Sequence, residues 1–311
     1  MTDYSHISVL RDEAVAELRP VDGGLYLDGT FGGGGYSNAI LERAACRLCA
    51  IDRDPEAVAR GGALSAAYPG RFEIMAGRIS DLSKLLAASD INALDGAVFD
   101  LGVSSYQIDD PSRGFSFRMD GPLDMRMGRE GRDAGDIVNL CPESELADIL
   151  FKYGDEKAAR RVAKAVVERR KIQKFATTAD LAGVIRGVVR PDKSGIDPAT
   201  RSFQALRIAV NEELTDIEAA LEQASALLKP GGRLVVVSFH SLEDRIVKHF
   251  FAERAGRMPT ASRHDPAGLA RASVPLFRLV NKSPVVPSLA EIRANPRARS
   301  AKLRAIERLA V

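Results

Sequence analysis

The residues best suited to chemistry are three acids and a run of glycines in the first third of the chain. Asp28 precedes a glycine-rich stretch, 29–35, and Asp52 and Asp100 each end a short apolar run. Glycines between a strand and a helix let the backbone approach a ligand, and the following helix N-terminus favours a phosphate or carboxylate. An acid at the end of the next strand can accept both hydroxyls of a ribose. The pattern indicates a site for a charged nucleoside cofactor.

The spacing of the glycines excludes two common nucleotide sites. The window that would carry G-x-G-x-x-G from Gly32 ends on Ser37, and no Lys-Ser/Thr pair follows the glycines as in a P-loop. An acid in front of the glycines suits a cationic group. S-adenosylmethionine offers an ammonium there, a carboxylate for the helix end and a ribose for Asp52, so the residues favour a methyltransferase and leave a dehydrogenase as a remote alternative.

Alternating strand and helix patterns must position these residues. Apolar runs separated by helical patterns lie at 24–28, 47–52, 72–75 and 96–101. Such an alternation is typical of a parallel sheet with helices on both faces. We therefore predict an α/β fold.

The strand pattern stops after Asp109 and resumes at 228–237, where a Pro-Gly-Gly turn like that of class I methyltransferases precedes a buried strand. The segment between them has helical patterns at 142–153, 156–170 and 178–189. We predict one α/β domain made of residues 1–108 and 206–311, interrupted by a helical insertion at 109–205. The segments 275–280 and 284–286 are candidates for its closing strands.

Composition and charge limit the partners of the chain. Its 311 residues are 45% hydrophobic and 28% charged, the balance of a globular protein. No run is long enough to span a membrane, and the acidic N-terminus is unlike a signal peptide. These features, with three cysteines, indicate a cytoplasmic protein without a membrane partner. The net charge is only +2, so an anionic partner must be held by local patches.

Cysteines and histidines offer further candidate sites. The pair Cys46 and Cys49 lacks the second pair that a zinc site requires, so we expect core cysteines and no metal. His240, directly after a buried strand, could orient a base or relay a proton. Alternatively, Ser241 could cap a helix that starts at Leu242, with His240 merely packed in the loop. No G-x-S-x-G elbow supports a hydrolase triad.

Eight segments, in order along the chain, resemble blocks of the RsmH (MraW) methyltransferases. They are 28–37, 50–55, 100–105, 113–117, 122–127, 199–208, 238–245 and 295–300. The resemblance implies a class I S-adenosylmethionine-dependent methyltransferase fold, in which a Rossmann-like domain is interrupted by a helical insertion domain for substrate recognition. It implies methylation of the N4 amino group of a cytidine in 16S rRNA of the small ribosomal subunit, and it allows for a homodimer.

The resemblance also assigns cofactor contacts. Together with Asp28, these residues are Gly33, Gly34, Gly35, Tyr36, Asp52, Ile79, Asp100 and Gln107. Tyr36 stands where the family often has His, and Ile79 where it often has Phe. Ile79 can cover one face of an adenine, although without aromatic stacking.

The target amine and the RNA need residues of their own. We expect the loop after Asp100, with Ser104 and Ser105, to supply hydrogen-bond acceptors to the amine, with His240 as a further catalytic candidate. Basic tracts lie at 157–174 and 293–308, and two aromatics between two arginines could hold an unstacked base. The expected RNA contacts are Arg113, Phe115, Phe117, Arg118, Arg201, Arg297 and Arg299.

Two other functions remain open at this point. A catalytically silent RNA-binding factor for ribosome assembly would keep the same fold, although the intact acids and glycines argue against decay. An amino methyltransferase acting on DNA would share the same sheet and cofactor loop. A cofactor titration separates the first from an enzyme, and the nature of the methylated substrate separates the second.

Overall fold

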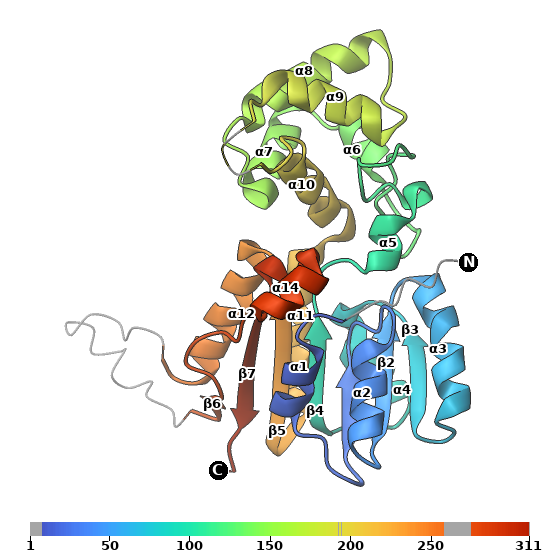
Figure 1. Cartoon of the computed structure of the whole chain (residues 1–311), viewed down its shortest axis with the longest axis vertical. Coiled ribbons are helices and arrows are strands. Elements are labelled where there is room, and N and C mark those ends of the chain that lie inside the picture. The colour runs from blue at the N-terminus through green and yellow to red at the C-terminus, as the bar shows by residue number, and fades with distance from the viewer. Residues whose placement is uncertain (1–7, 192, 194, 258–274, 311) are drawn as a thin grey trace, which may run out of the picture. The chain divides into compact units, whose positions relative to one another are not determined.

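The computed structural model describes residues 8–191, 193, 195–257 and 275–310. The chain divides into two compact units, Met1–Gly102 with Leu214–Val311, and Val103–Glu213. The expected helical insertion, 109–205, falls inside the second unit. Figure 1 colours the chain by residue number, so the two segments of the first unit are blue to cyan and orange to red.

The first unit is built on a seven-stranded sheet in the order β3-β2-β1-β4-β5-β7-β6. Its strands are β1 (Leu25–Asp28), β2 (Arg47–Asp52), β3 (Phe72–Ala76), β4 (Leu94–Asp100), β5 (Leu228–Ser238), β6 (Phe277–Leu279) and β7 (Lys302–Arg308). The first five strands pair in parallel, and β7 is antiparallel to both β5 and β6. This sheet confirms the expected Rossmann-like class I methyltransferase fold.

Helices cover both faces of that sheet (Figure 1). They are α1 (Arg11–Leu18), α2 (Gly35–Arg43), α3 (Pro55–Ala67), α4 (Leu82–Ala88), α11 (Glu213–Leu227) and α12 (Ser241–Arg254). The same unit contains α14 (Leu289–Ala294) and the short 3₁₀ turns η1 (Ile79–Asp81) and η3 (Pro296–Ser300). One apolar cluster includes Leu18 and Ile40, and a second includes Leu86 and Leu221. Strands buried on both faces explain why their sequences read as continuous apolar runs.

Local signals explain where several of these helices begin. The Asp54 side chain accepts a hydrogen bond from Glu56 N at 3.0 Å, and Pro55 occupies the first turn of α3. An acidic N-cap followed by proline is a strong start signal. The helix places its N-terminus just beyond Asp52, where the expected ribose site lies.

The second unit is helical. It contains α5 (Ser105–Asp109), the 3₁₀ turn η2 (Pro111–Arg113), α6 (Ala134–Leu140), α7 (Glu143–Gly154), α8 (Ala159–Ile172), α9 (Thr178–Val188) and α10 (Thr200–Asn211). A third apolar cluster, which includes Leu150, Val162 and Phe203, forms its core. The expected helices at 142–153, 156–170 and 178–189 are confirmed as α7, α8 and α9.

The cysteines and the membrane prediction can also be checked in the described residues. Cys46 and Cys49 are buried and free, as expected for core residues, and Cys141 is buried and free as well. In the part of the chain that the structure describes, no helix is long and apolar enough to cross a membrane.

Candidate functional site

Three acids end three neighbouring strands of the sheet. Asp28, Asp52 and Asp100 are the last residues of β1, β2 and β4, and β1 lies between the other two. The chain order reverses between β1 and β4, which is where open α/β sheets bind ligands at the carboxyl ends of their strands. The three acids predicted from the sequence therefore lie together at the carboxyl ends of the strands, the acidic edge of the first unit.

The glycine loop joins β1 to the N-terminus of α2. Gly32 and Gly34 have φ angles of 52° and 78°, values that L-residues with a side chain rarely adopt. Gly34 is the N-cap of α2 and contributes no side-chain hydrogen bond. A Cβ on Gly35 would lie 2.0 Å from Ser8 Oγ. The loop is thus packed on one side. Its N-cap residue supplies no side-chain acceptor to the first amides of α2, which are the groups that bind a carboxylate at a helix end, although Asp28 accepts the amide of Ser37 in that turn.

Asp28 holds the glycine loop through hydrogen bonds to residues on either side of the glycines at 32–35. Its Oδ2 accepts a hydrogen bond from Ser37 Oγ at 2.7 Å, and its Oδ1 accepts one from Thr30 N at 3.1 Å. The residue is 1% exposed, and burial raises the pKa of its carboxyl to about 6. Both oxygens bind residues of the loop and of α2, so Asp28 fixes the conformation of the glycine loop.

Asp52 links the second strand to the same loop. Its Oδ2 accepts a hydrogen bond from Gly32 N, and its Oδ1 accepts one from Asp54 N, both at 2.8 Å. Burial raises the pKa of this carboxyl. Each oxygen keeps a lone pair, which is what bidentate binding of a ribose diol needs.

Asp100 is the acid whose charge the protein does not balance. Its Oδ1 is buried and has no hydrogen-bond partner among the described residues. Burial, and then the neighbouring carboxylates of Asp28 and Glu243, raise the pKa of Asp100 well above its ordinary value. A carboxylate with a buried, unpaired oxygen beside two other carboxylates attracts either a proton or a cationic ligand. The ammonium-bearing methionine part of S-adenosylmethionine fits this edge.

Affinity for the cofactor should therefore depend on pH. The raised pKa of Asp28, about 6, and that of Asp100 mean that lowering the pH adds protons to the carboxyl that holds the glycine loop and to the carboxyl that faces the cation. Between pH 7 and 5.5 we expect the affinity to fall, by roughly tenfold per pH unit for each proton displaced. Calorimetry across this range measures it, and Asp28→Asn should make the dependence shallower. A flat profile would contradict the acidic site.

A buried ion-pair cluster joins the two loops that are expected to contact the ribose and the adenine. Asp216, 5% exposed on α11, receives hydrogen bonds from Arg78 Nε at 3.1 Å and from Arg53 Nη1 at 3.5 Å. Arg53 directly follows Asp52, and Arg78 directly precedes Ile79, which begins η1. Asp216 therefore fastens both loops expected around the ribose and adenine to one helix. No local pattern in the sequence predicts this cluster, because its three residues are far apart along the chain.

Loss of the Asp216 charge should loosen these two loops. We expect Asp216→Asn to raise the KM for S-adenosylmethionine about tenfold with little change in kcat, because it leaves two arginines without their common partner. Asp216→Glu, which keeps the charge, should restore most of the affinity. Steady-state kinetics with both substrates varied measures this. An unchanged KM for the cofactor in Asp216→Asn would show that the cluster serves stability alone.

Comparison with known proteins decides the family. The family model described as "MraW methylase family" matches residues 3–309. The chain belongs to the MraW methylase family. It is a methyltransferase, and its cofactor is S-adenosylmethionine.

Curated relatives of this methylase match along nearly all of their length. "Ribosomal RNA small subunit methyltransferase H" of Acidiphilium cryptum is 66% identical over 98% of this chain and 98% of the relative. The protein of the same name from Granulibacter bethesdensis is 57% identical over 97% of this chain and 91% of the relative. A solved structure, a putative rRNA-methylase from Clostridium thermocellum, is 12% identical, covers 97% and 98% of the two chains, and has a TM-score of 0.44.

The methylase has a second polar cluster where β5 ends. His240 is the N-cap of α12, and its Nδ1 accepts a hydrogen bond from Glu243 N at 3.3 Å. The fully buried Glu243 accepts hydrogen bonds from Phe239 N and His240 N at 2.7 and 3.1 Å. The sequence alternative in which Ser241 caps the helix is wrong, because α12 begins at Ser241.

The expected catalytic serines lie in the second unit of the methylase. Ser104 is the N-cap of α5: its Oγ accepts from Gln107 N at 3.3 Å, and Gln107 Oε1 accepts from Ser104 N at 3.1 Å. Ser105 is the first residue of α5. The capping box gives Ser104 and Gln107 a structural task beside the roles predicted for them.

Tyr36, another expected cofactor residue, has its side chain in the core. It is 3% exposed, and its hydroxyl donates a hydrogen bond to Val9 O. Only its backbone, in the first turn of α2, belongs to the glycine loop. The replacement of His by Tyr is therefore accommodated within the protein core.

The predicted RNA-binding loop is anchored to the helical core. Arg113 is 3% exposed and donates hydrogen bonds to Arg126 O and Met127 O at 3.1 and 3.0 Å. Phe117 packs edge-on against Phe203, with 4.7 Å between ring centroids. Phe115 also packs on this core, 5.8 Å below the Arg113 guanidinium. Phe115 and Phe117 thus hold the loop against the helical core.

The other expected RNA contacts lie at the surface of their units. Arg118, Arg201, Arg297 and Arg299 are exposed. Two other cations of the basic tract at 293–308 are paired within the chain. Lys302 Nζ and Arg304 Nε bind the carboxylate of Asp244 at 2.9 and 2.7 Å. Those two cations pair β7 with α12 within the first unit.

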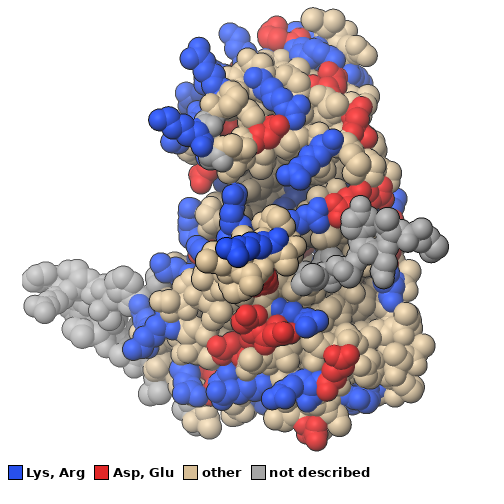
Figure 2. Space-filling view, in the orientation of Figure 1, with Lys and Arg blue, Asp and Glu red and all other residues tan. Residues whose placement is uncertain are grey.

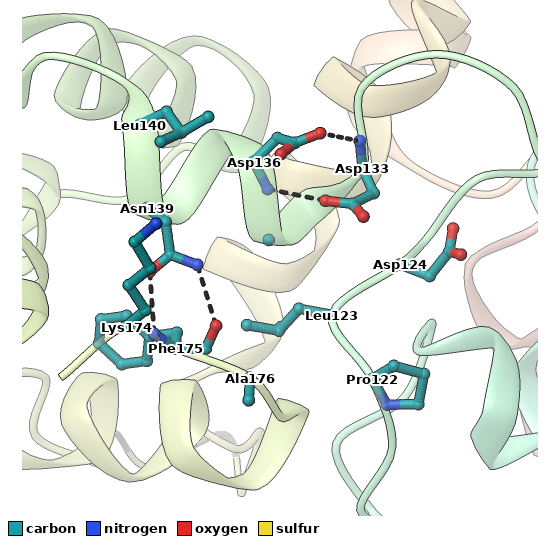
Figure 3. Close-up of a pocket in the computed structure, with 11 residues that line it drawn as sticks. Pro122, Leu123, Asp124, Asp133, Asp136, Asn139, Leu140, Lys174, Phe175 and Ala176 are labelled. Atoms are coloured by element: carbon teal, nitrogen blue, oxygen red, sulfur yellow. Dashed lines mark hydrogen bonds between the residues drawn. The ribbon is translucent and has the colours of Figure 1, made fainter.

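The helical unit also contains an open pocket of about 380 Å³ (Figure 3). Its polar groups already bind one another: Asp133 and Asp136 form the capping box of α6, and Asn139 exchanges hydrogen bonds with the backbone of Phe175 at 2.8 and 2.9 Å. We assign it no role in the reaction.

Proposed function

We propose that this methylase transfers the methyl group of S-adenosylmethionine to the N4 amino group of a cytidine in 16S rRNA of the small ribosomal subunit. The observation that carries the proposal is the unpaired buried oxygen of Asp100 at the acidic edge of the sheet. The family and the names of its relatives, which specify the small ribosomal subunit, support the substrate.

Each element at this edge has a part in holding the cofactor. The amides at the start of α2, with Gly33, Gly34 and Gly35, receive the carboxylate, and Asp100 faces the cationic methionine part. Asp52 binds the ribose hydroxyls, and Ile79 covers the adenine. The bound cofactor supplies an activated methyl group on sulfur, and the protein aligns it with the acceptor.

The acceptor requires positioning more than acid–base chemistry. The lone pair of a cytosine amine is delocalised into the ring, so hydrogen-bond acceptors must hold its N–H groups and orient the nitrogen. Ser104 and Ser105 follow Asp100 in the chain after a short loop, 101–103. We assign acceptor roles to this loop, and solvent can take the proton after transfer.

His240 fits a positioning role better than that of a proton acceptor. Its Nδ1 already accepts the Glu243 amide, and its Nε2 lies 3.1 Å from Glu243 Oε1. We expect His240→Asn, which keeps a capping acceptor, to retain kcat within a few-fold, whereas His240→Ala should lose about 1 kcal/mol of stability. Single-turnover methylation and thermal unfolding measure the two. A loss of about a hundredfold in His240→Asn would instead make His240 a catalytic base.

RNA contacts are proposed at the exposed residues of the predicted set. These are Arg118, Arg201, Arg297 and Arg299, whereas the buried Arg113 shapes its loop. Phe115 and Phe117 support the same loop from the core. A homodimer stays a prediction, and action on bacterial ribosomal subunits would place the protein in the cytoplasm.

One set of assays separates this function from its two alternatives. The purified protein is titrated with S-adenosylmethionine and then given labelled cofactor with unmodified small subunits, free 16S rRNA or duplex DNA. The proposal predicts binding of the cofactor and label on ribosomal RNA. Cofactor binding with label on DNA would favour the DNA methyltransferase, and absence of cofactor binding would favour the silent assembly factor.

A further inference from the structure

Helix α8 carries a row of cations on its solvent face. Lys157 lies in the turn before the helix. Arg160 and Arg161 lie four and three residues before Lys164, which places these three side chains side by side on the helix. All four are exposed. The opposite face packs into the helical core through Ala159, Val162, Ala163 and Val166.

These cations differ from the others of the same helix. Arg169 binds both oxygens of Asp180 at 2.7 Å, Arg170 donates to two backbone carbonyls, and Lys171 pairs with Glu168 at 2.8 Å. Among the described residues, the side chains of the four cations in the row make no hydrogen bond or ion pair. The last turn of α8 is thus internally neutralised, and its beginning is not.

The row does not serve the stability of the helix. Arg160 and Arg161 lie in the first turn of α8, where the helix dipole disfavours positive charge, and no acid occupies that turn. Asp155 precedes the row and Glu168 follows it on the same face, but neither forms an ion pair with a cation of the row. A charge placed against the dipole and left unpaired is suited to a partner outside the chain.

We propose that Lys157, Arg160, Arg161 and Lys164, the α8 basic face, bind phosphates of the ribosomal RNA substrate. This inference rests on the proposed function and adds a second contact surface to the residues already discussed. The chain has a net charge of only +2, so affinity for a polyanion must come from such local patches. In Figure 2, Lys and Arg side chains are exposed over the helical unit, at the top of the view, with Asp and Glu side chains among them.

Phosphate contacts of this kind are sequence-independent and sensitive to salt, because binding releases condensed counterions. Removing three of them should flatten the slope of log affinity against log salt by about 2 to 3. The effect should appear in the KM for ribosomal subunits. Neither kcat nor affinity for S-adenosylmethionine should change, because the α8 basic face has no part in the cofactor site.

The test compares wild-type protein with Arg160→Gln/Arg161→Gln/Lys164→Gln on unmodified small subunits. Binding is measured from 50 to 300 mM KCl, together with KM and kcat. We expect at least a tenfold higher KM at 150 mM KCl and a flatter salt slope. Thermal unfolding and cofactor binding confirm that the variant is folded.

A matched pair sharpens the comparison. Lys164→Gln and Lys171→Gln remove the same charge from the same exposed helix, but Lys171 is already paired with Glu168. Only Lys164→Gln should change the salt slope. Equal slopes for wild type and the triple variant, with wild type methylating the subunits, would overturn this inference alone. Wild-type protein that fails to bind the subunits would overturn the proposed function as well.

Discussion

Replacement of Asp100 by asparagine should reduce affinity for S-adenosylmethionine by about a hundredfold or more. Asparagine keeps the shape of the side chain and removes the charge that faces the cationic ligand, and loss of one partner of a buried ion pair costs about 3–5 kcal/mol. The free protein should be equally stable or more stable, because Asp28 and Glu243 lose a neighbouring acid. Calorimetry and thermal unfolding, both at pH 7.5, measure the two effects.

The control for Asp100→Asn lies at the other end of the same strand. Asp95 of β4 accepts hydrogen bonds from Leu25 N and Lys229 Nζ at 2.8 Å, away from the carboxyl ends of the strands. Asp95→Asn should bind the cofactor as wild type does. If Asp100→Asn also binds normally and only turnover is lost, Asp100 acts on the acceptor amine and our assignment is wrong.

Replacement of Gly34 by alanine should damage both the fold and the cofactor site. A left-handed residue with a side chain costs about 1–2 kcal/mol, and the new Cβ would lie 2.7 Å from the buried ring of Phe31. We expect a total loss of roughly 2–4 kcal/mol of stability. Cofactor affinity should fall at least tenfold, because the first turn of α2 must move. Denaturant unfolding and calorimetry measure these effects.

Gly70 provides the matched control, since its φ of 73° is close to the 78° of Gly34 and a Cβ there meets nothing within 4 Å. Gly70→Ala should therefore lose only the backbone contribution and bind the cofactor normally. Equal losses of stability in the two variants would mean that Phe31 yields easily. Normal cofactor binding by a folded Gly34→Ala would remove the glycine loop from the binding site.

The arrangement of Asp28, Asp52 and Asp100 at the carboxyl ends of neighbouring strands could be predicted because its signals are local. An apolar strand that ends in an acid, a glycine run and an Asp-Pro helix start each occupy a few consecutive residues, and parallel pairing of the strands brings their ends together. The sequence also indicated a helical insertion, because its long segment lacks strand patterns. The predicted helix start at Leu242 was wrong by one residue, because an imidazole nitrogen of His240 replaces the usual hydroxyl as the cap.

Contacts between distant parts of the chain could not be predicted in this way. The segment that forms β7 was interpreted as part of an RNA-binding tract, yet Lys302 and Arg304 pair with Asp244 about sixty positions earlier. Asp216 likewise meets Arg78 from another element. A positive charge in a sequence does not reveal whether its partner is a distant carboxylate of the same chain or a phosphate of another molecule.

The measurement that tests the account most directly is transfer of labelled methyl groups from S-adenosylmethionine to small ribosomal subunits from cells that lack this protein, followed by nucleoside analysis of the rRNA. The account predicts that the label is recovered as N4-methylcytidine and that Asp100→Asn transfers none. No label on subunits shown to be unmodified, or label on a nucleoside other than cytidine, would contradict it.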